Sequence, residues 1–216
     1  MYKRNQIELA ISSWLEPKTR GPSQGLKTRV KRLLETDRAL GHAPRSGDPE
    51  KANFAFFRDA APGSGFEIWF SAYEAFALLL GLQLMSHNWP QRFVVSVLRQ
   101  VRPALEKEHN RILKRDPKEL FDEAAIARAR KPGSPAFDTL DPAFLVIVSH
   151  HGLSANQEDG PYACSVQPDL GSASAWVQKI TKGVGGGATM FELTAAAHEL
   201  AKALERTRPQ NRGRPG

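Results

Sequence analysis

The sequence has little of what several protein classes require. Its one cysteine, Cys164, excludes an intramolecular disulfide framework and a zinc site built from cysteines. Its longest apolar run, residues 75–85, contains Gln83 and is shorter than the roughly 18 residues that a membrane-spanning helix needs. The N-terminal residues lack the apolar core of a signal peptide. We therefore expect a cytoplasmic protein without a membrane partner.

Motifs of common enzymes are also missing. The chain has no Gly-x-Ser-x-Gly elbow, and its glycine-rich stretch 183–187 is neither a Walker A loop nor a dinucleotide fingerprint. The pair His150-His151 lacks the ligand spacing of a zinc site. The sequence thus predicts no catalytic residue, no metal site and no cofactor. An enzyme with a site in residues 143–190 is the least favoured hypothesis.

What the sequence does have is positive charge, and this charge is unevenly distributed. Lys and Arg number 30 against 23 Asp and Glu, which gives a formal net charge of +7. Residues 17–32 hold six cations and no acid, whereas residues 132–205 carry a net charge of −5. A solvated helix face usually interleaves acids with its cations, so the acid-free stretch favours a polyanionic partner such as a nucleic acid.

Hydrophobic periodicity predicts two helices at the start of the chain, over residues 4–15 and 26–40. The second has an apolar stripe on one side and cations largely on the other, which is typical of a helix that enters a DNA major groove. Aromatic residues then alternate over 54–58 and 66–70 around a Pro/Gly-rich turn, which predicts a β-hairpin.

A helix follows this hairpin directly, because Ser71 and Glu74 have the spacing of a capping box. This order of elements resembles the MerR-type winged-helix DNA-binding domain. In that family a helix-turn-helix precedes a two-stranded wing, and the second strand of the wing leads into a capped helix, as the stretch 66–76 does here. The resemblance covers residues 4–115, and it implies DNA binding as a homodimer.

Carried over by position, the resemblance implies major-groove contacts from the second helix and phosphate contacts from the wing and the segment before it. The implied DNA-binding residues are Lys27, Thr28, Arg29, Lys31, Arg32, Lys51 and Arg58. Arg and Lys can both neutralise phosphates and read base edges, so the sequence leaves open which residue does which.

The C-terminal half contains strand and helix patterns of its own. The apolar run 144–148 predicts a buried strand, and 162–167 and 175–180 are weaker strand candidates. Thr189 and Glu192 have the spacing of a second capping box, which predicts a helix beginning there.

The expected fold class is mainly α with a β-hairpin wing, that is a winged helix-turn-helix, followed by a helical connector and a small α/β C-terminal domain. The expected domains are a winged helix over 1–102, a connector that would serve dimerisation over 103–131, an α/β domain over 132–205 and a disordered basic tail over 206–216.

The sequence favours a sequence-specific double-stranded DNA-binding protein, acting as a homodimer in transcription regulation. The alternative is a non-catalytic interaction protein whose N-terminal part binds nucleic acid without sequence preference. In either case the C-terminal domain would take a partner protein or a ligand. The DNA target, and the choice between activator and repressor, stay open.

Overall fold

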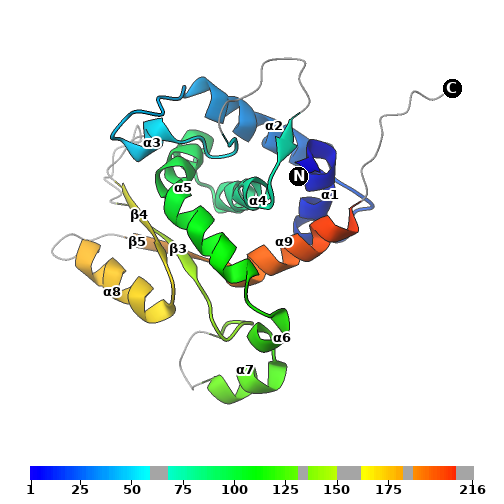
Figure 1. Ribbon diagram of the computed structural model, residues 1–216, viewed down its shortest axis with the longest axis vertical. Coiled ribbons are helices and arrows are strands. Elements are labelled where there is room, and N and C mark those ends of the chain that lie inside the picture. Colours follow the sequence, from blue (N-terminus) through cyan, green and yellow to red (C-terminus); the bar gives the residue numbers. More distant parts are fainter. Residues whose placement is uncertain (59–67, 131–135, 150–161, 182–186, 208–216) are drawn as a thin grey trace. The chain divides into compact units, whose positions relative to one another are not determined.

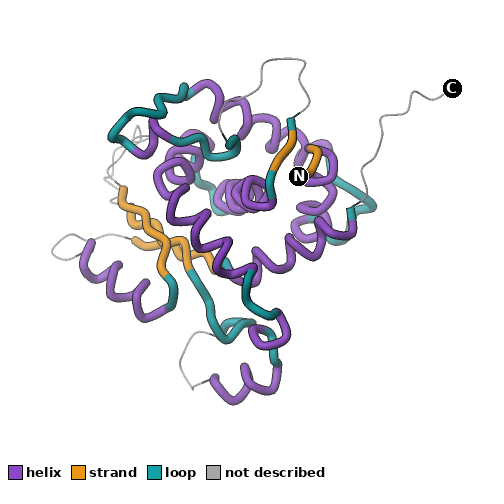
Figure 2. Tube along the Cα trace, viewed as in Figure 1, coloured by secondary structure: helices purple, strands orange, loops and turns teal. Residues whose placement is uncertain are grey.

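The computed structural model describes residues 1–58, 68–130, 136–149, 162–181 and 187–207 (Figure 1). Within these ranges helices predominate and the strands form two small antiparallel sheets, which confirms the expected α-rich fold (Figure 2). The chain divides into two compact units, one made of Met1–Arg99 with the chain from Glu199 onward, the other of Gln100–His198.

The first unit is mainly helical. Its elements are β1 (Tyr2–Lys3), α1 (Arg4–Leu15), α2 (Gln24–Ala39), α3 (Pro49–Ala52), β2 (Trp69–Phe70), α4 (Ala72–Ser86), the first part of α5 (Gln91–Leu113) and the end of α9 (Thr194–Arg206). Eleven residues of α4 are buried, so this helix forms the centre of the unit's core. A Cβ added at Gly81 would lie 3.2 Å from Leu33 Cδ1, because α2 packs closely on α4 there.

The caps of the helices account for most of their boundaries. The expected helix over 4–15 is confirmed as α1, and α2 begins two residues earlier than expected because the Ser23 hydroxyl oxygen accepts a hydrogen bond from Leu26 N at 3.1 Å. The expected capping box of α4 is also confirmed. Ser71 N donates to Glu74 Oε2 at 2.6 Å, and Glu74 N donates to Ser71 Oγ at 3.2 Å.

The β-hairpin expected from residues 54–58 and 66–70 is wrong. Residues 54–57 are buried and form no strand, and β2 pairs with β1, which comes from the very start of the chain. The expected turn lies in residues 59–67, outside the described residues.

Asp37, a buried residue of α2, explains why residues 54–57 form no strand. Its Oδ1 accepts a hydrogen bond from Ala55 N at 3.0 Å, and its Oδ2 accepts one from Phe56 N at 2.9 Å. The backbone N–H groups of Ala55 and Phe56 therefore donate to the Asp37 carboxylate, and they do not pair with a second strand.

Arg99 of α5 holds this carboxylate in place. Its Nε donates to Asp37 Oδ1 at 2.7 Å, its Nη2 donates to the Asp37 carbonyl oxygen, and its Nη1 donates to the Gly41 carbonyl oxygen at 2.8 Å. The side chains of Asp37 and Arg99 are 0% and 1% exposed. This buried ion pair joins α2, α5 and the chain between them.

The α5 helix runs without interruption from Gln91 to Leu113, with Pro103 inside it. It therefore continues across the domain boundary expected after residue 102. A proline removes one helical hydrogen bond. Val101 and Leu105, on either side of it, are buried, so packing holds the helix together at this point.

The second unit combines helices with a three-stranded sheet. Its elements are the rest of α5, α6 (Pro117–Leu120), α7 (Glu123–Ala129), β3 (Phe144–Ser149), β4 (Tyr162–Gln167), α8 (Leu170–Thr181), β5 (Gly187–Glu192) and the beginning of α9. The strand order is β4-β3-β5, and all pairs are antiparallel. The strands expected over 144–148 and 162–167 are confirmed.

The strand candidate over residues 175–180 is wrong, because these residues belong to α8. Asp169 begins this helix, and its Oδ1 accepts a hydrogen bond from Ser172 N at 2.8 Å. Ala173 shares a core cluster with Phe144 and Val146 of β3, and Trp176, three residues later, packs against this cluster. The residues that pack in the core are spaced as in a helix, and not at every second position as in a strand.

The capping box expected at Thr189 and Glu192 is also wrong. Both residues lie in β5, and α9 begins at Thr194. The Glu192 carboxylate accepts hydrogen bonds from Thr194 N at 2.6 Å and from Ala195 N at 2.9 Å. Glu192 thus caps the helix from the strand that precedes it, and α9 begins five residues after Thr189, where the pattern predicted the cap.

Several expectations fall on residues outside the described ranges. These are the His150-His151 pair, most of the glycine-rich stretch, and the tail beyond Thr207, whereas Arg206 is the last residue of α9. Among the described residues, no helix is long and apolar enough to cross a membrane.

Candidate nucleic-acid interface

The solvent side of α2 carries its cations in two rows. The buried stripe of the helix consists of Leu26, Val30, Leu33, Leu34 and Asp37. With 100° between successive residues, Thr28 and Glu35 lie farthest from this stripe. Lys27 and Lys31 (the lysine row) follow one flank, and Arg29 and Arg32 (the arginine row) follow the other. All four cations are exposed, and Thr28 is half-buried.

The charge of these rows is largely available to an external anion. Lys31 Nζ lies 3.6 Å from Glu35 Oε1, and both side chains are more than half exposed, so this pair is weak. In the described part of the chain, Lys27, Arg29 and Arg32 form no ion pair within 4.0 Å, although the charge of Arg29 acts on the Glu16 carboxyl. The structure therefore brings five of the seven expected DNA-binding residues together on one helix.

The loop before α2 is held closed by Glu16. Its Oε1 accepts a hydrogen bond from Ser23 Oγ at 2.5 Å, and its Oε2 accepts one from Ser23 N at 2.9 Å. The Ser23 hydroxyl, then the Ser23 amide, and finally the charge of Arg29 lower the pKa of the Glu16 carboxyl. Lys18 and Arg20, both exposed, thus extend from a loop that is fixed at its two ends.

Replacing Glu16 by glutamine is expected to loosen this loop, because an amide nitrogen cannot accept the second hydrogen bond. We expect the free energy of unfolding at neutral pH to fall by about 0.5–1.5 kcal/mol, the usual contribution of one hydrogen bond. Thermal unfolding followed by circular dichroism measures the change. Glu35→Gln, which breaks only the exposed pair with Lys31, is the matched control. An equal effect of the two substitutions would contradict the role given to Glu16.

Arg58 and Lys51, the expected phosphate contacts, are both exposed but differ in their surroundings. Arg58 directly follows Phe57, whose ring centroid lies 5.3 Å from Cζ of Arg38 on α2. Lys51 lies on α3, with its Nζ 3.7 Å from Asp48 Oδ2, so a neighbouring acid shares its charge. The structure thus places neither Arg58 nor Lys51 on α2 with the other five residues.

Sequence reasoning did not find Arg4, which borders the lysine row. Arg4 Nη2 donates to the Lys27 carbonyl oxygen at 3.1 Å, and its Nε donates to Glu8 Oε1 at 2.7 Å. The side chain of Arg4 is 39% exposed. No spacing in the sequence relates Arg4 to Lys27, since the two lie 23 residues apart and meet only through the packing of α1 on α2.

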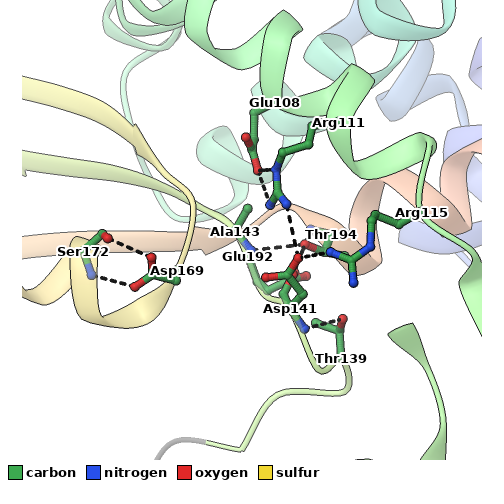
Figure 3. A network of polar contacts seen from close by, with 10 residues as sticks. All are labelled: Glu108, Arg111, Arg115, Thr139, Asp141, Ala143, Asp169, Ser172, Glu192 and Thr194. Atoms are coloured by element: carbon green, nitrogen blue, oxygen red, sulfur yellow. Dashed lines mark hydrogen bonds and ion pairs between the residues drawn. The ribbon is translucent and has the colours of Figure 1, made fainter. Parts of the chain in front are cut away.

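Two arginines of the second unit, Arg111 and Arg115, are arranged differently, because internal acids hold them (Figure 3). Asp141 Oδ2 accepts hydrogen bonds from Arg115 at 2.6 Å and from Arg111 at 3.2 Å, and Glu108 Oε1 accepts one from Arg111 Nη2 at 2.7 Å. Thr194 Oγ1 donates to the Asp141 carbonyl oxygen at 2.9 Å. This network ties the entry of β3 to α5 and α9, and we assign it a structural role.

Burial and hydrogen bonding shift two pKa values in this network. The hydrogen bond to Glu108 raises the pKa of the Arg111 guanidinium above its usual value. Burial raises the pKa of the Glu192 carboxyl, although backbone hydrogen bonds to its carboxylate act in the opposite direction. Within the described ranges, no group of three or more His, Cys, Asp or Glu side chains could hold a metal ion.

The arrangement on α2 is therefore the candidate site, and it is suited to binding a phosphate backbone. Comparison of the chain with models of protein families, with curated proteins and with solved structures gave no match.

Proposed function

We propose that the protein binds double-stranded DNA through α2 and acts as a sequence-specific transcription regulator. The observation that carries this proposal is the pair of exposed cationic rows on the two flanks of one helix, preceded by residues 17–23, which contain Lys18 and Arg20 and no acid. Of the resemblance to the MerR-type domain, the order of the helices and the capped junction at Ser71 support the proposal, whereas the expected wing does not, because residues 54–58 form no strand and β2 pairs with β1.

The dimensions of DNA fit this arrangement. A helix with its side chains is about 10–12 Å wide, and the major groove is about 12 Å wide. A helix lying in the groove has one phosphate backbone on each side, so each row can reach one of them. Thr28, at the centre of the ridge, would then face the base edges, and Arg29 and Arg32 could also pair with guanine.

The test uses two double variants and a matched control. Arg29→Gln/Arg32→Gln removes the arginine row, and Lys27→Gln/Lys31→Gln removes the lysine row. Lys114→Gln/Lys118→Gln removes the same charge from exposed positions in the second unit. Fluorescence anisotropy at several salt concentrations compares binding to the duplex upstream of the protein's own gene with binding to a scrambled duplex.

We expect each row variant to weaken binding at least about tenfold and to reduce the salt slope by nearly 2, because two phosphate contacts are lost. The control should bind as the unaltered chain does. Row variants that bind like the control would refute the proposal. Equal binding of both duplexes, lost with salt, would favour the alternative of an interaction protein that binds nucleic acid without sequence preference. The homodimer stays a prediction, which sedimentation of the unaltered chain tests.

A further inference from the structure

The first turn of α5 contacts the arginine row of α2 through Gln91. The side-chain nitrogen of Gln91 donates to the Arg32 carbonyl oxygen at 3.3 Å and to the hydroxyl oxygen of Thr36. Thr36 follows Arg29 by seven positions and Arg32 by four, so it continues the flank of α2 on which the arginine row lies. Both contacting segments belong to the first unit (Figure 1). The arginine row therefore borders a second helix.

Arg92, the next residue of α5, lies on the side of this helix that faces α2. It precedes Arg99 by seven residues, which is about two helical turns, so both side chains leave α5 on the same side. Arg99 contacts α2 from that side, since its Nε donates to Asp37 Oδ1 at 2.7 Å. Arg92 thus lies about 10 Å nearer the start of α5, beside the residues of α2 that Gln91 contacts.

Arg92 and Arg99 differ in burial and in charge pairing. Arg99 is 1% exposed and is paired with a buried carboxylate. Arg92 is exposed, and it forms no hydrogen bond or ion pair with any residue that the structure describes. Glu50 of α3 faces α5 one turn further on, but its Oε1 accepts a hydrogen bond from Ser96 Oγ at 2.7 Å and is not paired with Arg92. The charge of Arg92 is therefore available to an external anion.

The width of the major groove determines what this part of α5 would meet on DNA. A helix with its side chains is about 10–12 Å wide and fills a groove about 12 Å wide. With α2 in the groove, no room is left there for a second helix. The start of α5, beside the arginine row, would therefore face the phosphate backbone that borders the groove on that side.

We propose that Arg92 binds a phosphate of the strand that the arginine row faces, so that α2 and α5 contact this strand together. This inference rests on the proposed function of α2. Arg29, Arg32 and Arg92 would form one cationic surface, because Gln91 and Arg99 hold α5 against α2. A contact of arginine with phosphate neutralises charge on any duplex, so Arg92 would add affinity without base specificity.

The experiment compares three single variants of the full chain with the row variants of α2. Arg92→Gln removes the charge and Arg92→Lys keeps it. Arg128→Gln, the matched control, removes an arginine charge from an exposed position in the second unit. Fluorescence anisotropy gives the affinity of each variant for one duplex at several salt concentrations, and the slope of log affinity against log salt counts the phosphate contacts.

We expect Arg92→Gln to reduce this slope by about 1, because one phosphate contact is lost, and Arg92→Lys and the control to leave it unchanged. The melting temperatures of Arg92→Gln and the control should agree, so that a changed slope reports a lost contact and not a lost fold. If Arg92→Gln has the slope of the control while the row variants have lower slopes, this inference is overturned and the proposal for α2 stands. If the row variants bind as the unaltered chain does, the proposal for α2 is refuted and this inference falls with it.

Discussion

Arg99→Met is expected to lower the free energy of unfolding by about 3–5 kcal/mol, because it leaves the carboxylate of Asp37 buried without its cation. Asp37 is 0% exposed, and its remaining partners, Ala55 N and Phe56 N, are neutral donors. Urea unfolding followed by circular dichroism measures the loss. Arg38→Met, which removes an exposed guanidinium that lies over the ring of Phe57, is the matched control, and its expected cost is below about 1 kcal/mol.

A double variant separates the charge from the packing. Asp37→Asn with Arg99→Met removes both charges and keeps one amide oxygen as an acceptor for the backbone of Ala55 or Phe56. We expect this double variant to be more stable than Arg99→Met alone, because no charge is left buried. If Arg99→Met costs no more than Arg38→Met, the ion pair does not hold residues 54–57 in place.

Lowering the pH from 6.5 to 4 is expected to remove about 3 kcal/mol of stability through His109. This side chain of α5 is 3% exposed. Burial, and to a smaller extent the charge of His198 on α9, lower its pKa from 6.5 to about 4. The unfolded chain therefore binds a proton at a higher pH than the folded chain. The contribution of His109 is complete above pH 6.5, decreases as the pH falls, and is lost below about pH 4.

Urea midpoints at pH 7, 5.5 and 4.5 measure this dependence. His109→Leu should flatten the decrease between pH 7 and 4.5, because the buried imidazole is gone, whereas His87→Gln, at an exposed position, should leave the decrease unchanged. Carboxylates such as Glu16 act at lower pH, since the pKa of Glu16 is lowered from 4.5. A His109→Leu variant with the same pH dependence as the unaltered chain would show that His109 does not cause it.

Local patterns in the sequence were sufficient where neighbours along the chain determine the structure. The capping box at Ser71, the helix over 4–15 and the strand over 144–148 are confirmed because their signals lie within a few residues of each other. The hairpin expected from residues 54–58 and 66–70 is wrong because backbone donors of its first strand go to Asp37, 18 and 19 residues earlier in the chain. No local pattern contains such a partner.

The candidate site was predictable in part for the same reason. The cations of α2 are visible as an acid-free stretch, but their division into two rows follows from the buried stripe of Leu26, Val30 and Leu33. The contact of Arg4 with Lys27 was not predictable, because the two residues lie 23 positions apart in the sequence. This contact exists only after α1 has packed on α2.

The presence of the end of α9 in the first unit has a consequence for the order of synthesis. The first unit contains the end of α9, so residues 100–198 form an insertion between its two parts. A chain growing on the ribosome exposes α2 early, yet the unit gains its last helix only after the whole second unit has emerged. Closing a longer loop costs little additional free energy, about 0.6 kcal/mol for each doubling of its length. The insertion therefore delays the folding of the first unit more than it lowers the stability of that unit. Until then, nascent chains would present a basic helix on an unfinished core.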